Sequence, residues 1–244
     1  MKREIQPEFQ HGGDKQVVSE NVAVRDAATL LLVDWSFDKP RILTGTRKKT
    51  LAFMPGLTVF PGGAVDKIDG DMPVAHDLST DTLQRLQLRA ALNLRDARAL
   101  ALAAIRETFE ETGALIGVRQ QPTAIPGEVW QAFVENNVMP SLENLQLVAR
   151  AITPPYRPRR FDTRFFMADA KDIAMTLPDI QETDLEDVAW LTLDEIFKKP
   201  LAFITQQVLT DIAPLLQMQK QKTREQPFPF YYSENIKYFV EMIG

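Results

Sequence analysis

The sequence predicts an α/β fold in which a mixed sheet lies between helices. Two apolar segments, residues 23–35 and 41–47, have the composition of buried strands, and a turn at Asp38-Lys39-Pro40 joins them. Beyond a glycine-rich turn lies a run at 97–105 that is rich in Ala and Leu and free of Gly and Pro, as a helix requires. Strands followed by such a turn and a helix are typical of a layered α/β sandwich.

The rest of the chain alternates between strand and helix signals. Residues 57–60 form a short strand before Pro61-Gly62-Gly63, and 160–167 and 188–191 are the next two strands. Helical segments are expected at 127–138, 142–148, 201–219 and 227–242, the first two as helices or short connections. The last segment carries aromatics that fit plain packing, a pocket wall or a homodimer interface: Phe228, Phe230, Tyr231 and Tyr232.

Length and composition set the broad class. The chain has 244 residues, 45% of them hydrophobic, which is enough for one substantial core. We expect one domain over 1–244, with an N-terminal arm at 1–22, a helical insert at 70–94 and a C-terminal helical extension at 195–244. The lack of cysteine excludes disulfides and thiolate metal sites. With no run long enough to span a membrane, we expect a cytoplasmic protein without a membrane partner. The net charge of −5 argues against a broad nucleic-acid footprint.

The predicted helix carries three carboxylates, Glu107, Glu110 and Glu111, roughly opposite its apolar face. Like charges spaced four residues apart near a helix C-terminus are unfavourable, because the helix dipole prefers cations there. A divalent cation that takes oxygen ligands, such as magnesium, manganese or calcium, would offset this repulsion. A plain charged surface is the alternative, and Arg106 and Gly113 beside the cluster make it the weaker one.

The segment from Arg106 to Gly113 resembles the second half of the Nudix box, GX5EX7REUxEExGU. Upstream, Phe60-Pro61-Gly62-Gly63 is similar to the Phe-Pro-Gly-Gly that opens the box in many members of that superfamily. Gly63 and Arg106 are 43 positions apart where the motif has 14, so 29 extra residues lie inside this box. Such an insert resembles the peroxisomal coenzyme A diphosphatase branch, the Nudix 19 type, and its bacterial relatives. The resemblance implies a mixed sheet between helices.

The insert leaves two alignments for the first acidic residue of the box. Asp69 lies six positions after Gly63, where the motif has Glu, whereas counting back from Arg106 places Arg98 there. Asp66 and Asp69 fit turn or capping positions equally well. The insert itself has a helix start at 77–80 and is expected to form a helical flap near the pocket.

The resemblance also implies metal-assisted hydrolysis of a diphosphate. Glu107, Glu110 and Glu111, with the carbonyl oxygen of Gly63, would hold Mg²⁺ or Mn²⁺ as the cofactor. Arg106 would orient these carboxylates.

The base that takes the proton from water would be Glu107 or Glu182, because acids on the loop before 188–191 often serve this role in Nudix folds. Glu186 is the second choice on that loop. A solvated acidic loop is the alternative for each of them.

Two further segments indicate the substrate. Arg47 belongs to a partial match to the coenzyme A signature LLTxRSx3Rx3Gx3FPGG, in which Lys48 and Ala52 depart from the pattern. Residues 158–166 are similar to a Pro-Arg-Arg-Phe-Asp-Thr-Arg-Phe-Phe segment of the Nudix 19 type. Guanidinium groups bind phosphate bidentately, and aromatics suit an adenine ring. The candidate substrate-binding residues are therefore Arg47, Arg159, Arg160, Arg164 and Phe161.

Each of these segments has an alternative interpretation. Arg160 and Arg164 also fit an edge strand protected by charge, or ion pairs with Asp162. The substrate expected from the resemblance is coenzyme A or an acyl derivative, with ADP-ribose or a dinucleotide close behind as nucleoside diphosphate partners. A non-catalytic nucleotide sensor has no need of the carboxylate cluster. An RNA cap hydrolase is disfavoured by the acidic charge balance.

Overall fold

The computed structural model describes residues 2–6, 22–155, 157–178, 183–217, 226–234 and 237–244. The central sheet contains β1 (Lys2–Ile5), β2 (Val24–Asp34), β3 (Arg41–Arg47), β4 (Thr58–Val59), β5 (Gly62–Ala64), β9 (Gln146–Ile152), β10 (Arg160–Asp169), β12 (Leu185–Thr192), β13 (Phe228–Glu234) and β14 (Lys237–Ile243). Two small sheets pair β6 (Ala114–Ile116) with β11 (Ile173–Thr176) and β7 (Val118–Arg119) with β8 (Val138–Met139). The helices are α1 (Thr80–Gln87), α2 (Leu94–Thr112), α3 (Gln131–Glu135), α4 (Leu193–Ile196) and α5 (Phe203–Leu216), with 3-10 turns η1 (Asp69–Asp71), η2 (Glu128–Trp130) and η3 (Ala170–Asp172).

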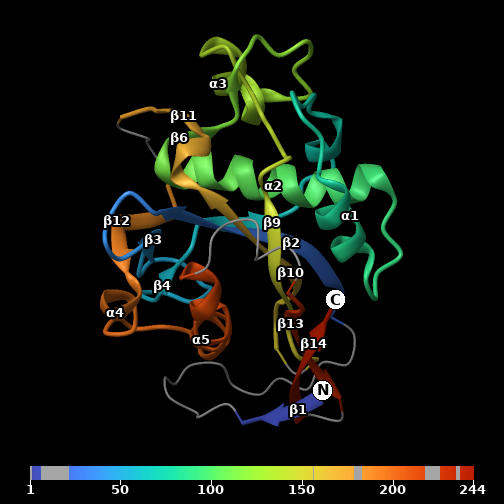
Figure 1. Ribbon diagram of the computed structural model, residues 1–244, viewed down its shortest axis with the longest axis vertical. Coiled ribbons are helices and arrows are strands. Elements are labelled where there is room, and N and C mark those ends of the chain that lie inside the picture. The colour runs from blue at the N-terminus through green and yellow to red at the C-terminus, as the bar shows by residue number, and fades with distance from the viewer. Residues whose placement is uncertain (1, 7–21, 156, 179–182, 218–225, 235–236) are drawn as a thin grey trace.

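The central sheet is mixed and lies between helices, which confirms the predicted fold class. Its order is β1-β14-β13-β9-β10-β2-β3-β12, with β4 beside β3 and β5 beside β2. Strands β2 and β10 are parallel, whereas β9 and β10 are antiparallel. Helix α2 crosses one face and α5 packs on the other (Figure 1). None of the described helices is long and apolar enough to cross a membrane.

Strand β2 is buried on both faces, as its apolar composition predicts. Leu30 and Leu32 join the core cluster under α2, and Leu31 and Val33 join the cluster under α5. This alternation follows from the two-residue period of a strand. A continuous apolar run is therefore what a central strand needs here.

Helix α2 has the predicted extent and the predicted stop. Asn93 begins it by accepting a hydrogen bond from the Asp96 amide at 2.9 Å, and Gly113 ends it with φ of 77°, in the left-handed region that favours glycine. Thr108, at a position where the motif has an apolar residue, is fully buried. Its hydroxyl donates to the Ala104 carbonyl at 2.7 Å, so the helix buries no unsatisfied group at this position.

The C-terminal segment is a β-hairpin, and the helix predicted for 227–242 is wrong. Strands β13 and β14 pair antiparallel and extend the sheet beside β9. Phe228 and Phe230 pack in the cluster under α2, whereas Tyr231 packs on the α5 side. The alternating aromatics favour a strand that is covered on both faces. Phe228, Phe230 and Tyr231 are buried within the chain, as the plain-packing alternative expects, and Tyr232 is half-buried.

Three other expectations also differ from the structure. The N-terminal arm at 1–22 contains a strand, since β1 pairs with β14. Residues 142–148 run into β9 rather than a helix, and only short turns of helix, η2 and α3, lie within 127–138. The extension at 195–244 begins with helices and ends with the hairpin. In the insert, α1 is confirmed, and the Ser79 hydroxyl caps it by accepting from the Thr82 amide at 3.2 Å.

Two buried arginines fasten the insert to the hairpin. Arg85 of α1 donates from Nε to the Leu147 carbonyl at 3.2 Å and lies over the Phe228 ring, 4.7 Å from its centroid. Arg150 of β9 lies over the Phe230 ring and donates to the carbonyls of Leu88 and Arg89. Stacking of guanidinium on an aromatic face is favourable when both are desolvated. The insert is therefore part of the folded core.

We expect Phe228→Ala to lower the free energy of unfolding by about 3–5 kcal/mol, because it opens a cavity in the core. Met242→Ala is the matched control, since Met242 is 45% exposed on the same hairpin; it should change stability by no more than about 0.5 kcal/mol. Urea denaturation measures both. Equal effects of the two substitutions would contradict the hairpin packing.

Candidate active site

Two glycines bring β5 against helix α2. Gly63 pairs with Ala28 of β2, and a Cβ at Gly63 would overlap the Glu107 carboxylate. A Cβ at Gly62 would overlap the backbone of β2, so this position requires glycine, whereas a Cβ at Gly63 would displace the Glu107 carboxylate. The amide of Gly62 donates to Glu111 Oε2 at 3.0 Å. The glycine turn and the carboxylate helix, far apart in the sequence, therefore meet directly.

Arg106 lies at the centre of the carboxylates and is only 5% exposed. Its Nε and Nη2 bind the two carboxylate oxygens of Asp69 at 2.8 and 3.0 Å. Its Nη1 donates to Glu107 at 2.7 Å and to Glu110 at 3.0 Å, and Nη2 also donates to the Ala64 carbonyl at 3.0 Å. All five N–H donors of this guanidinium are thus used. Arg106 fixes the carboxylates from within the protein.

The structure decides between the two alignments of the first acidic residue. Asp69 is fully buried and forms the bidentate pair with Arg106, whereas Arg98 forms an ion pair with Asp77 elsewhere on α2. Asp69 also accepts a hydrogen bond from the Asp66 amide at 2.8 Å. Asp69 therefore occupies the position of the first acid of the box, and the insert begins directly after it.

The site holds more negative charge than Arg106 compensates. Burial raises the pKa of Glu107 and of Glu110 above the usual range, although the Arg106 charge opposes this. Burial raises the pKa of Glu111 to about 8; the Gly62 amide and Arg47 oppose the shift, and the charges of Glu107 and Asp184 add to it. An added cation would stabilise all three carboxylates in their charged form.

The donor atoms fit a hard divalent cation. Carboxylate oxygens together with a backbone carbonyl are the ligands that Mg²⁺ and Mn²⁺ prefer. In the part of the chain that the structure describes, no three acidic or histidine side chains surround a common point. Arg106 donates to Glu107 and Glu110, and the Gly62 amide donates to Glu111. Metal binding would therefore exchange hydrogen bonds for coordination.

The loop before β12 approaches the same carboxylates. The Thr183 hydroxyl donates to the Glu111 carbonyl at 3.3 Å, and Asp184 accepts from Arg47 Nη2 at 3.2 Å. Glu182, the first candidate base on this loop, lies outside the described residues, and Glu186 is exposed on β12. Asp184 was not singled out from the sequence, although the acidic run at 182–187 contains it.

Arg47 lies near the carboxylates of α2, where its charge acts on Glu111, and it does not line the cavity beside β10. Its Nε donates to the Phe53 carbonyl at 3.0 Å, and its side chain is 16% exposed. The Phe53 ring meets the Phe161 ring edge to face, with centroids 5.7 Å apart. Arg47 and Phe53 therefore connect the carboxylate site with the arginine-rich strand β10.

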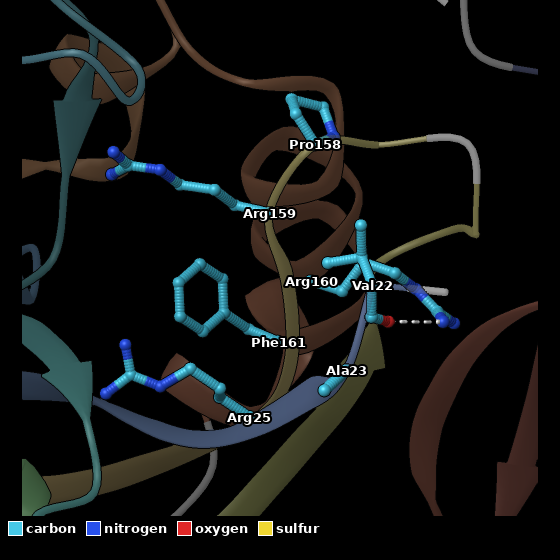
Figure 2. Close-up of a pocket in the computed structure, with 7 residues that line it drawn as sticks. All are labelled: Val22, Ala23, Arg25, Pro158, Arg159, Arg160 and Phe161. Atoms are coloured by element: carbon cyan, nitrogen blue, oxygen red, sulfur yellow. Dashed lines mark hydrogen bonds between the residues drawn. The ribbon is translucent and has the colours of Figure 1, made fainter. Parts of the chain in front are cut away.

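The arginine-rich segment lines a cavity of about 460 Å³. Figure 2 shows the residues around it: Val22, Ala23, Arg25, Pro158, Arg159, Arg160 and Phe161. Arg160 donates to the carbonyls of Thr153 and Val22 at 3.2 and 3.3 Å, so its guanidinium binds the backbone that surrounds the cavity. Arg25 is the member that sequence reasoning missed, because it lies far from the motif.

Arg164 does not reach this cavity, which corrects its expected role in substrate binding. It is 2% exposed and donates to Asp26 at 2.6 Å and to the Asp162 carbonyl at 2.8 Å. Successive side chains of β10 point to opposite faces, so Phe161 and Arg164 face different sides of the sheet. The ion-pair alternative holds for Arg164.

Comparisons with known proteins agree with this fold. No family model matches the chain. "Putative nudix hydrolase 7" of Caenorhabditis elegans is 26% identical over 187 residues, which cover 68% of this chain and 51% of that protein. The chain thus spans about half the length of that curated relative. The crystal structure of a NUDIX hydrolase from Alicyclobacillus acidocaldarius is 26% identical, covers 81% of this chain and 97% of its own, and has a TM-score of 0.60.

The sheet between helices is similar to the fold of the NUDIX hydrolase from Alicyclobacillus acidocaldarius. The chain is therefore similar to Nudix hydrolases in sequence and in fold.

We expect Asp69→Asn to destabilise the protein by about 3–5 kcal/mol, because it removes the charged partner of a buried guanidinium. Asp71→Asn is the matched control from the same turn. Its ion pair with Arg95 is exposed, so the loss should not exceed about 1 kcal/mol. Chemical denaturation measures both. Similar losses would show that the Asp69 pair is no more important than a surface pair.

We expect the metal-free protein to lose stability as the pH rises from about 4.5 to 8. The pKa of Glu111 is raised from 4.5 to about 8 in the folded state, so the protonated form fits the site. Below pH 4.5 the group is protonated in both states and costs nothing; toward pH 8 and above, the folded protein must bury its charge. Glu111→Gln should flatten this slope, whereas Glu135→Gln on exposed α3 should not. The free energy of unfolding is measured by urea denaturation at several pH values with a chelator present. Parallel pH dependences of wild type and Glu111→Gln would contradict the prediction.

Proposed function

We propose that this chain is a metal-dependent diphosphatase that hydrolyses the diphosphate linkage of a nucleoside diphosphate derivative. The observation that carries the proposal is the Arg106 cluster, in which Asp69, Glu107 and Glu110 share one buried guanidinium beside Gly63. Glu111 is buried and Glu107 and Glu110 are partly buried, and the pKa of each is raised; such a cluster is costly to maintain, and a cation bound with the substrate would offset that cost.

Each residue has a role that follows from its position. Glu107, Glu110 and Glu111, with the Gly63 carbonyl, would hold Mg²⁺ or Mn²⁺. When bound, such a cation polarises phosphoryl oxygens and lowers the pKa of water. Arg106 orients the carboxylates from the buried side and does not contact the substrate.

The reaction consumes one water. Its oxygen forms a bond to one phosphorus atom, the bridging P–O bond breaks, and the bridging oxygen leaves on the other phosphate. A carboxylate takes the proton of the water, and Glu107 and Glu182 are the candidates. Burial raises the pKa of Glu107, which brings it closer to the range of a base that works near neutral pH.

Coenzyme A or an acyl derivative is the substrate that we propose, with phosphopantetheine and adenosine 3′,5′-bisphosphate as products. Arg159 and Phe161 of the cavity would bind the nucleotide half, and Arg47 would lie between that half and the carboxylates. ADP-ribose and dinucleotides are the alternatives within this chemistry. A nucleotide sensor without catalysis is the alternative of another class.

We expect Glu110→Gln to lower kcat for coenzyme A by about 10² or more, because a metal ligand supplies several kcal/mol of transition-state stabilisation. Glu135→Gln is the matched control and should keep wild-type activity. Mass spectrometry of the products, with magnesium and then manganese, measures the reaction for coenzyme A, ADP-ribose, NADH and capped RNA.

The outcomes separate the alternatives. Phosphopantetheine released by the wild type and lost in Glu110→Gln supports both the chemistry and the substrate. Cleavage of another diphosphate keeps the metal chemistry and overturns coenzyme A. No turnover of any substrate with either metal would favour the sensor.

A further inference from the structure

The cavity between β2 and β10 contains two arginines that have no anionic partner. Arg25 and Arg159 are both exposed, and neither forms a hydrogen bond or ion pair within the part of the chain that the structure describes. No acidic residue lines the cavity. Elsewhere in β10 and its neighbours, arginines are paired, as Arg164 and Arg150 are with Asp162. Unpaired guanidinium groups in a concave site are suited to an anionic ligand.

An aromatic ring lies between these two charges. Arg25 of β2 is the register partner of Phe161 on the parallel strand β10. Figure 2 shows Arg25, Phe161 and Arg159 projecting to the same side, with the ring between the two guanidinium groups. Phe53 adds a second ring against Phe161. The cavity thus offers two positive charges for an anion and the Phe161 ring, which Phe53 supports, for a flat or ring-shaped group.

The cavity is separate from the carboxylate site. Along β2, Arg25 is three residues from Ala28, the partner of Gly63, which corresponds to about 10 Å. Because side chains alternate along a strand, Arg25 and Ala28 also point to opposite faces. A diphosphate bridge held at Gly63 and the carboxylates cannot neutralise Arg25 and Arg159 at the same time. A ligand that fills both sites therefore carries a second anionic group.

We propose that this cavity binds a phosphomonoester carried by the nucleoside half of the substrate, with the nucleoside against Phe161 and Phe53. A phosphomonoester has three terminal oxygens, so it can accept from both guanidinium groups. Coenzyme A carries such a group, whereas dephospho-coenzyme A and ADP-ribose do not. This inference deepens the proposed function and rests on it for the substrate, but the binding step can be measured alone.

The binding arm uses isothermal titration with adenosine 3′-phosphate, adenosine 2′-phosphate and adenosine. We expect a nucleoside phosphate to bind at least about tenfold more tightly than adenosine, because charge-assisted hydrogen bonds discriminate at this level. Arg25→Gln and Arg159→Gln should each remove most of this preference. Arg119→Gln, on the separate β7–β8 sheet, is the matched control and should keep it. Equal binding of adenosine and its phosphates would overturn the proposal.

The kinetic arm compares coenzyme A with dephospho-coenzyme A. We expect Arg25→Gln and Arg159→Gln to raise KM for coenzyme A about tenfold and to raise KM for dephospho-coenzyme A much less, because only coenzyme A carries the phosphomonoester. Tighter binding of the 2′-phosphate would support the site and point to a 2′-phosphorylated dinucleotide. Hydrolysis of both compounds with equal KM would overturn the cavity proposal and keep the diphosphatase. Phosphate-selective binding without hydrolysis would keep the cavity proposal and overturn the diphosphatase.

Discussion

The bidentate ion pair between Arg106 and Asp69 is the interaction on which the site depends. It joins α2 to the start of η1, directly before the insert, and the same guanidinium also donates to the backbone carbonyl of Ala64 in β5. A buried arginine requires a partner for every donor, so these three elements can pack in only one way. The carboxylates of Glu107 and Glu110 are then held by hydrogen bonds from the same guanidinium.

Sequence alone predicted the structure correctly where the local residue pattern allowed one interpretation. The apolar run of β2 required a central strand, and Gly113 required the end of α2. It was insufficient where a distant residue decided the outcome. Asp69 and Arg98 were equivalent candidates by counting, because the insert breaks the spacing, and only the three-dimensional pairing separates them. The C-terminal hairpin was missed because its aromatic residues pack as a strand only beside β9, and the first residues of β9 lie in the segment 142–148 that was predicted as a helix or a short connection.

Three arginines of one short segment show why residue type alone does not identify a binding site. Arg159 is exposed, Arg160 binds backbone carbonyls, and Arg164 is buried beside Asp26. Side chains alternate between the two faces of β10, and the pairing with β2 decides which neighbours each arginine meets. Asp26 and Arg25, adjacent in the sequence, lie on opposite faces, so exposed Asp26 pairs with the buried Arg164 and Arg25 adds charge to the cavity. Strand register, which motif similarity does not supply, sets these roles.

The insert inside the box has a consequence for how such a site can change over evolutionary time. Asp69 and Arg106 are 37 residues apart, where an uninterrupted box would place them eight apart. Loop-closure entropy grows only with the logarithm of loop length, so this extension costs roughly 1 kcal/mol. The buried pair holds both ends of the loop in place whatever lies between them. Segments of very different length could therefore be exchanged at this point, which would give the fold a position for acquiring new surface without rebuilding its catalytic helix.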